Sequence, residues 1–116
     1  MTNEVTPRVE ILGFEGCPNV APTHALVERV ARELGLEPVV EVVDVADAED
    51  AVKLRFLGSP SVRVDGVDVE PGAEARSDHV LSCRVYGTAG GYSGQPSEAW
   101  VRDALRRAAG APRRTC

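Results

Sequence analysis

The sequence lacks long apolar runs and a C-x-x-C cysteine pair, and it is poor in aromatic residues. Aromatic side chains make up 4% of the 116 residues, and no uninterrupted apolar stretch approaches the roughly 18 residues that a membrane span needs. The formal net charge of −5 repels nucleic acid and anionic membranes on average. The sequence therefore predicts a globular protein whose partners are neither nucleic acid nor membrane.

Residues 1–7 also lack the basic start and the apolar stretch of a secretory signal. If Met1 is the native start, we expect a cytoplasmic protein. The length matches the usual size of one compact domain, about 100 to 150 residues. We therefore expect a single domain over residues 1–116, with its core at about residues 8–110 and a flexible tail at residues 111–116.

Three cysteines are present, Cys17, Cys83 and Cys116. A reducing cytosol keeps such thiols free, so a structural disulfide framework is not expected. No Cys/His cluster has zinc-finger spacing, which disfavours a closed structural zinc site. We therefore predict no cofactor and no structural metal, and we expect any chemistry to begin from a single thiol.

The first half of the chain predicts a strand, a helix and a second strand. Residues 8–14 alternate and then run apolar into a tight turn, which is typical of a strand. Apolar residues at helical spacing predict a helix over residues 20–34, with Gly35 just past its end. The β-branched run at residues 39–45 predicts a strand that is covered on both faces and lies inside a parallel pairing.

The second half predicts a short helix, a hairpin and a last helix. Asp47 is the expected N-cap of the short helix, and Val52 and Phe56 are among its inward candidates. Asp65-Gly66 is a two-residue type I′ turn signal between two alternating strands. Apolar residues at helical spacing predict the last helix over residues 97–109.

Two short strings connect this pattern to a known family. The string Gly16-Cys17-Pro18-Asn19-Val20 follows the first strand, and Gly58-Ser59-Pro60 precedes the third. With the order βαβαββα, this layout resembles the thioredoxin-like superfamily over residues 9–109. The resemblance implies an α/β fold, with a central mixed sheet flanked by helices and a long segment before the last helix. It also implies that Cys17 lies beside a cis Pro60 at one end of the sheet.

The same resemblance suggests site residues and a reaction. In the family, the backbone next to the cis proline pairs with an extended substrate, so Ser59 and Pro60 are candidate substrate-binding residues, and Pro18 fits the family pattern. The cysteine at this position attacks disulfides, which gives Cys17 the role of nucleophile. A helix N-terminus favours thiolate over thiol, because unpaired N–H groups and the positive end of the helix dipole meet it.

Val20 stands where a dithiol enzyme of the family has its second cysteine, which excludes a two-cysteine cycle inside this motif. Three interpretations stay open for Cys17: a monothiol that forms mixed disulfides, a dithiol that recruits Cys83 or Cys116, and a fold without redox function. Each predicts different behaviour of the thiols.

The segment between Val69 and Ser97 is too long for a simple connection, since loops beyond about 12 to 15 residues are usually functional or flexible. We hypothesise that it folds over Cys17 and presents Cys83 as a resolving thiol or as a second soft-metal ligand. The alternative makes Cys83 a small buried residue on a strand at residues 80–86.

Three functions therefore compete. The first is a thiol/disulfide oxidoreductase-like protein with Cys17 as nucleophile, whose partner is a disulfide-bearing protein or a low-molecular-weight thiol. The second is a soft-metal protein in which Cys17 and Cys83 bind Hg(II) or Cu(I). This hypothesis follows from a similarity of residues 56–64, Gly66, Glu70-Pro71 and Ser82-Cys83-Arg84 to small bacterial thioredoxin-family proteins labelled alkylmercury-lyase related. The third is a non-catalytic binding module.

Other candidate residues have ordinary structural alternatives. Asp44 is a candidate proton donor if its strand end is desolvated, and otherwise it ends the strand. His24 and His79 are candidate bases or ligands, although each stands alone in its stretch. Trp100 is expected to pack the last helix onto the sheet.

Overall fold

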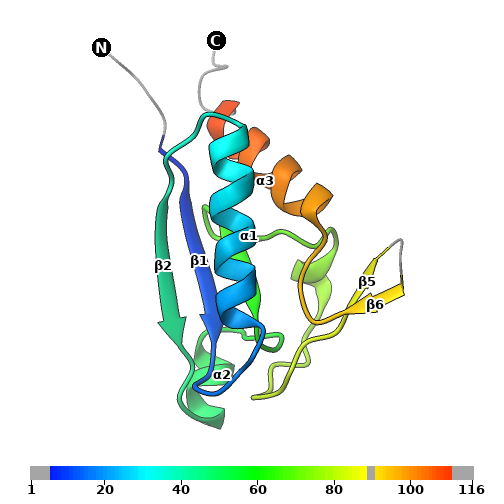
Figure 1. The fold of residues 1–116 in the computed structure, drawn as a ribbon. Coiled ribbons are helices and arrows are strands. Elements are labelled where there is room, and N and C mark those ends of the chain that lie inside the picture. Colours follow the sequence, from blue (N-terminus) through cyan, green and yellow to red (C-terminus); the bar gives the residue numbers. More distant parts are fainter. Residues whose placement is uncertain (1–5, 89–90, 111–116) are drawn as a thin grey trace.

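The computed structural model describes residues 6–88 and 91–110 of the chain. Its centre is a mixed four-stranded sheet in the strand order β2-β1-β3-β4 (Figure 1). Strands β1 and β2 are parallel, whereas β3 is antiparallel to both β1 and β4. The predicted α/β class, with a mixed sheet and flanking helices, is confirmed. The strands are β1 Arg8–Gly13, β2 Val39–Asp44, β3 Ser61–Val64 and β4 Val67–Asp68, and a separate hairpin pairs β5 Tyr86–Thr88 with β6 Gly91–Ser93.

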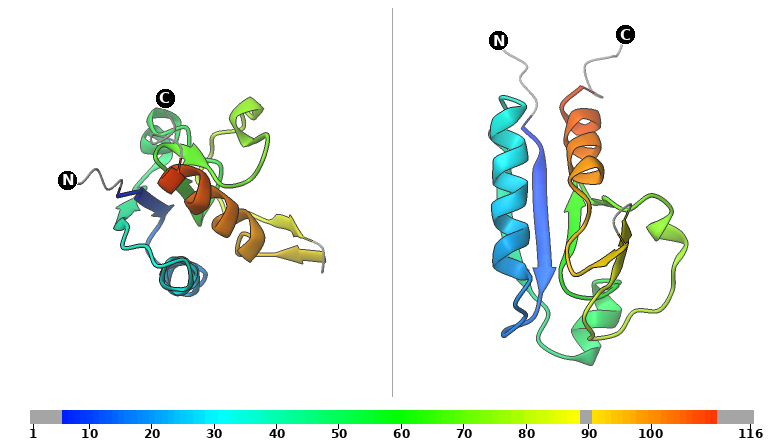
Figure 2. Two further views of the ribbon diagram at one scale, coloured as in Figure 1. Left: turned by 90° about the horizontal axis from the view of Figure 1, so that it is seen from above. Right: turned by 45° about the vertical axis from the view of Figure 1, so that its right-hand side comes forward.

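Helices cover both faces of the sheet, because apolar residues of β1 alternate between the two faces. Helices α1 (Val20–Glu33) and α3 (Glu98–Gly110) pack on the face where the larger core forms, as the views in Figure 2 show. Helix α2 (Ala48–Lys53) packs on the other face, in a smaller core around Leu12 and Phe56. The predicted order βαβαββα is confirmed for these elements, and the long segment before α3 adds the 3-10 helix η1 and the β5–β6 hairpin.

Strand β2 corrects one prediction. It forms at the expected residues, but it is the edge strand of the sheet, and β1 lies between it and β3. Val39 and Val42 are 50% and 52% exposed, so the strand is not covered on both faces. A run of β-branched residues indicates extended backbone, but it does not determine how many neighbours a strand acquires.

The first helix ends as predicted. Gly35 follows it with a φ of 72°, and the Leu36 N–H donates to the Ala31 carbonyl at 2.9 Å. This bond belongs to a Schellman motif, in which glycine accommodates the left-handed backbone without steric cost. Val27, Val30 and Ala31 are buried against the sheet, as their spacing predicted.

The short helix α2 is capped as predicted and ends in an unusual way. The Asp47 carboxylate accepts the Asp50 N–H at 2.9 Å. Phe56 is fully buried after the end of the helix, whereas Val52 is 62% exposed, so its inward placement was wrong. Arg55 occupies the left-handed position after the helix with a φ of 55°, where glycine is the common residue.

The predicted hairpin turn is confirmed. Asp65 and Gly66 have φ values of 51° and 85°. They connect β3 to β4, and Val64 and Val67 on either side of them are directly paired across the two strands. A type I′ turn requires positive φ at both central residues, which explains the Asp-Gly pair. The Asp65 carboxylate also accepts the Arg8 N–H at 2.9 Å, which fixes the turn to the start of β1.

The last helix also begins and packs as predicted. The Ser97 hydroxyl accepts the Trp100 N–H at 3.1 Å, which is a side-chain N-cap. Val101, Ala104 and Leu105 are buried on one face of the helix.

The predicted tail at residues 111–116, with Cys116, lies outside the described residues. Within residues 6–88 and 91–110, no helix combines the length and the apolar character needed to cross a bilayer.

Candidate functional site

Two connections leave the sheet at the same end. Strand β1 ends at Gly13, and its antiparallel neighbour β3 begins at Ser61, which pairs with Leu12. The β1–α1 turn and the loop before β3 therefore meet at this end. Strand β2 ends there as well, because Asp44 pairs with Gly13 in the parallel register.

Cys17 lies in the β1–α1 turn and is 9% exposed. Its N–H donates to the Phe14 carbonyl at 3.1 Å. Helix α1 begins at Val20 with Asn19 as its N-cap, so the structure places Cys17 before the helix rather than in its first turn. The predicted direct contact with the helix N-terminus is corrected in this respect, because exposed Pro18 and half-buried Asn19 form a turn between the cysteine and the helix.

Gly13 joins the cysteine turn to the loop before β3. A Cβ atom at Gly13 would lie 2.6 Å from Val20 Cγ2 and 2.8 Å from Ser59 Oγ. Both distances are shorter than real Cβ contacts, so only glycine fits between the helix start and Ser59. The Oγ atom of Ser59 and the Oγ1 atom of Thr23 are buried without a hydrogen-bond partner among the described residues.

The Ser59–Pro60 peptide bond is cis, as the family resemblance implied. Both backbone polar groups of Ser59 are bound within the chain. Its N–H donates to the Ser82 carbonyl at 2.8 Å, and its carbonyl accepts the Arg84 N–H at 2.9 Å. Residues 82–84, which we call the strap, therefore form an isolated parallel bridge centred on Ser59 and Cys83.

The strap excludes one of the two alternatives for Cys83. Cys83 is exposed and strand β5 begins only at Tyr86, so a buried position on a strand at residues 80–86 is excluded. Cys17 and Cys83 are both free, and no cysteine pair among the described residues lies near disulfide distance. The structure thus brings Cys83 beside Ser59 without joining it to Cys17.

A cavity of about 440 Å³ opens at the same end of the sheet. Phe14 and Glu15 of the cysteine turn line one part of it, and Leu81, next to the strap, lines another. Asp44 also lines this cavity but is exposed. It is therefore not the desolvated proton donor that the sequence suggested.

Arg84 anchors the strap from inside the protein. Its side chain is 1% exposed and donates to the two Asp68 carboxylate oxygens at 2.7 and 3.1 Å and to Glu70 at 2.7 Å. Burial acts to lower the Arg84 pKa, but the bonds to Asp68 and the charges around it raise that pKa above its ordinary value. The guanidinium is therefore a permanent charge whose partners lie on β4 and just after it.

Tyr86 ties this cluster to the cis peptide. The Arg84 guanidinium carbon lies 4.4 Å from the centroid of the Tyr86 ring, in a cation–π contact. The Tyr86 hydroxyl donates to the Pro60 carbonyl at 2.6 Å, and burial raises the pKa of this hydroxyl. The Trp100 ring centroid lies 6.3 Å from that of Tyr86. Trp100 also packs against the larger core, which contains residues of β1 and β3, as its predicted place between α3 and the sheet requires.

Sequence reasoning missed Arg84, Asp68 and Tyr86 as parts of the site. The usable signal was weak: two carboxylates alternate on and just after β4, at Asp68 and Glu70, and an arginine follows Cys83. Charged residues in an irregular segment are usually exposed, so a buried arginine is not the default expectation.

The two histidines do not join the thiols in a metal site. His24 pairs with Glu28 at 3.3 Å on α1, and His79 lines a separate cavity. No group of three or more metal-ligating side chains occurs in the described part of the chain.

Comparisons with known proteins add no assignment. No protein-family model matches the chain, and no curated protein matches its sequence. The geometry alone therefore describes the site: a nearly buried thiol in the β1–α1 turn, a cis Ser59–Pro60 peptide at the same sheet end, and an exposed second thiol on the strap.

Proposed function

We propose that the protein has a thioredoxin-like fold and exchanges disulfides through Cys17 as a monothiol. The observation that carries the proposal is the meeting of the cysteine turn and the cis Ser59–Pro60 peptide at one end of the sheet, with Gly13 between them. The chain order βαβαββα and the strand order β2-β1-β3-β4 support it.

The proposed reaction needs two external partners, a disulfide and a thiol. The Cys17 thiolate attacks one sulfur of a disulfide, a bond forms between Cys17 and that sulfur, and the other half leaves as a thiolate that takes up a proton. A second thiol, as its thiolate, then attacks the sulfur bound to Cys17, forms a new disulfide with it and releases Cys17 as a thiolate. Since Val20 replaces a resolving cysteine and Cys83 is not at disulfide distance, a low-molecular-weight thiol of the cytoplasm resolves the intermediate.

The exposure of the two thiols predicts their substrates. Cys17 is 9% exposed, so only a small disulfide, or one held in an extended loop, reaches it. The adjoining cavity of about 440 Å³ is large enough for the remainder of a small disulfide. Cys83 is exposed, so its reaction with thiol reagents would mask that of Cys17 and has to be removed in a test.

One observation favours a non-catalytic binding module instead. The N–H and carbonyl groups of Ser59, which the family resemblance assigns to an extended substrate, are already bound to residues 82 and 84. A protein in which the strap never leaves Ser59 has no free backbone there to receive a substrate segment.

The test uses the variant Cys83→Ser/Cys116→Ser, in which Cys17 is the only thiol. We expect glutathione disulfide to form a mixed disulfide at Cys17 in the folded protein, and added reduced glutathione to release it, as intact-mass and peptide spectra will show. The same variant in guanidinium confirms that the thiol is chemically competent. Failure of Cys17 to react in the folded protein, with reaction in guanidinium, refutes the exchange function and leaves the binding module.

A further inference from the structure

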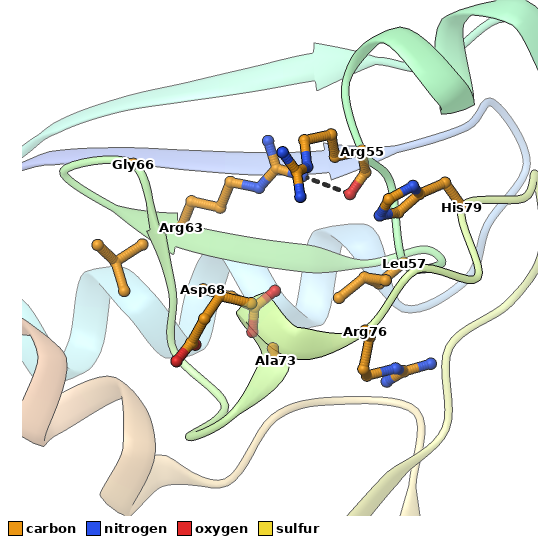
Figure 3. Close-up of a pocket in the computed structure, with 10 residues that line it drawn as sticks. Arg55, Leu57, Arg63, Gly66, Asp68, Ala73, Arg76 and His79 are labelled. Carbon is orange, nitrogen blue, oxygen red and sulfur yellow. Dashed lines mark hydrogen bonds between the residues drawn. The ribbon is translucent and has the colours of Figure 1, made fainter.

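A second cavity lies away from the thiol site, on the sheet face that carries α2. Its volume is about 500 Å³, within the range of about 300 to 1,000 Å³ that is typical of small-molecule sites. The wall combines residues from the segment that follows α2, from β3 and β4, and from the segment around η1 (Figure 3). Cys17, Ser59 and Cys83 are not among the residues that line it.

Cationic side chains dominate this wall. Arg55, Arg63 and Arg76 line the cavity together with His79. Arg76 is already paired, because it donates to the Asp78 carboxylate at 2.8 Å. Arg55 and Arg63 have no carboxylate partner within the described ranges, so neither positive charge is neutralised by an ion pair.

The carboxylates near the cavity do not neutralise these charges. Asp68 lines the cavity, but both its oxygens are bound by Arg84. Glu74 also lines the cavity, but it is exposed on η1 and forms no ion pair with Arg55 or Arg63 among the described residues. Glu10, which faces Arg63 across the β1–β3 pair, likewise forms no ion pair with it in the described part of the chain.

The backbone fixes Arg63 beside Arg55. One Arg63 nitrogen donates to the Leu54 carbonyl at 2.7 Å and to the Arg55 carbonyl at 3.0 Å. Figure 3 shows the side chains of Arg55, Arg63 and His79 among those that line the cavity. The carbonyls after α2 orient the Arg63 guanidinium, and the charges of Arg55 and Arg63 on one cavity wall together attract an anion.

Arg55 also departs from the local backbone preference. It holds the left-handed position of a Schellman motif after α2, where the Phe56 N–H donates to the Ala51 carbonyl at 2.8 Å. Glycine adopts this conformation without steric cost, and arginine does not. A residue that the helix end itself disfavours, with a guanidinium at the cavity, indicates a role beyond folding.

We propose that this cavity binds a small organic anion. Arg55 and Arg63 hold its oxyanion, a phosphate or a carboxylate, because guanidinium forks donate two parallel hydrogen bonds to such groups. His79 completes the polar side. The apolar part of the ligand packs on Leu57, Val67 and Ala73, which line the rest of the cavity.

The test measures binding of three related probes by NMR titration: phenyl phosphate, benzoate and benzyl alcohol. We expect saturable binding of at least one of the two anions with shifts at Arg55, Arg63 and His79, and no binding of the neutral alcohol. Tighter binding of phenyl phosphate assigns a phosphate ligand, and tighter binding of benzoate assigns a carboxylate. Absence of binding by both anions to the folded protein overturns the proposal.

Matched variants separate a specific site from general charge attraction. Arg55→Gly is expected to lose about tenfold or more in affinity for the anion, the usual effect of losing charge-assisted hydrogen bonds, without a lower melting temperature. Arg55→Gln provides a second variant without the backbone change, and it is expected to lose affinity as well. Arg106→Ala removes the same charge from the exposed surface of α3 and is expected to bind as the wild type does. Equal losses in Arg55→Gly and Arg106→Ala overturn the site.

Discussion

The buried cation of the strap gives the sharpest prediction for stability. In the variant Arg84→Met, the side chain volume is largely kept, but the hydrogen bonds to Asp68, Glu70 and Ser61 are lost. The Asp68 side chain is 10% exposed and then lacks its cation, whereas Glu70 is 26% exposed and regains water more easily. Breaking a buried pair by removing one partner costs about 3 to 5 kcal/mol of unfolding free energy. Because Glu70 is partly exposed, we expect Arg84→Met to lose about 3 kcal/mol.

The assay is urea unfolding at neutral pH, followed by the fluorescence of the single tryptophan and by circular dichroism. We expect the midpoint to fall without a large change in the slope, and amide hydrogens at the Ser59 bridge to exchange faster than in the wild type. The variant Arg84→Met/Asp68→Leu should recover much of the loss, because an apolar pair of similar volume removes the stranded charge. A loss below about 1 kcal/mol in Arg84→Met would refute the reasoning, since that value is typical of exposed ion pairs.

Two further predictions concern the backbone and the surface. Gly58→Ala is expected to destabilise the fold by about 1 to 3 kcal/mol or more, because Gly58 has a φ of 117° and its added Cβ would lie 2.8 Å from the Cβ of Arg84; urea unfolding measures the loss. The bond from Arg102, followed by the bond from Arg29, lowers the pKa of Glu33 below its usual value of 4.5. The resulting stabilisation is present above pH 4.5 and is lost as the pH falls through the lowered pKa, so melting temperatures should drop more steeply in acid for the wild type than for Arg102→Gln.

Each of these variants has a control. Gly72 has a φ of 83° with no heavy atom within 4 Å of an added Cβ, so Gly72→Ala isolates the backbone cost from the clash. Equal losses in Gly72→Ala and Gly58→Ala would show that the contact with Arg84 has no effect. Arg29 and Arg102 form ion pairs with Glu33 and Glu98 on the surface of α1 and α3. For the acid titration, Arg106→Gln removes an exposed charge that has no part in these pairs, and a curve equal to that of Arg102→Gln would disprove the assignment to Glu33.

Local signals in the sequence predicted the elements well, because the chemistry that fixes them is also local. The Asp65-Gly66 turn requires positive φ at both residues, and this pair supplies it. Asp47 caps the next peptide groups along the chain, and Gly35 closes the first helix in the same way. In each case the partners lie within a few residues of one another.

The remaining features depend on partners that are distant in the sequence. The edge position of β2 follows from which strands pair with β1, and a β-branched run carries no information about that choice. Arg84 is buried because Asp68 lies on β4, 16 residues earlier in the chain. The exposure of Cys83 likewise follows from the bridge to Ser59, 24 residues away by the difference of their numbers. The cis Pro60 was predicted only through the family resemblance, since X-Pro bonds are cis in about 5 to 6% of folded cases.

The strap competes with any partner segment that binds to the backbone of Ser59. A partner segment that adds to the sheet end at Ser59 has to displace residues 82–84, which belong to the same chain and are held there by two backbone hydrogen bonds. A tethered competitor acts at an effective concentration that dilution does not change. The apparent affinity of any such partner is therefore reduced by the small fraction of molecules in which the strap is detached. Because Cys83 is the middle residue of the strap, the event that uncovers Ser59 also moves the exposed thiol away from it.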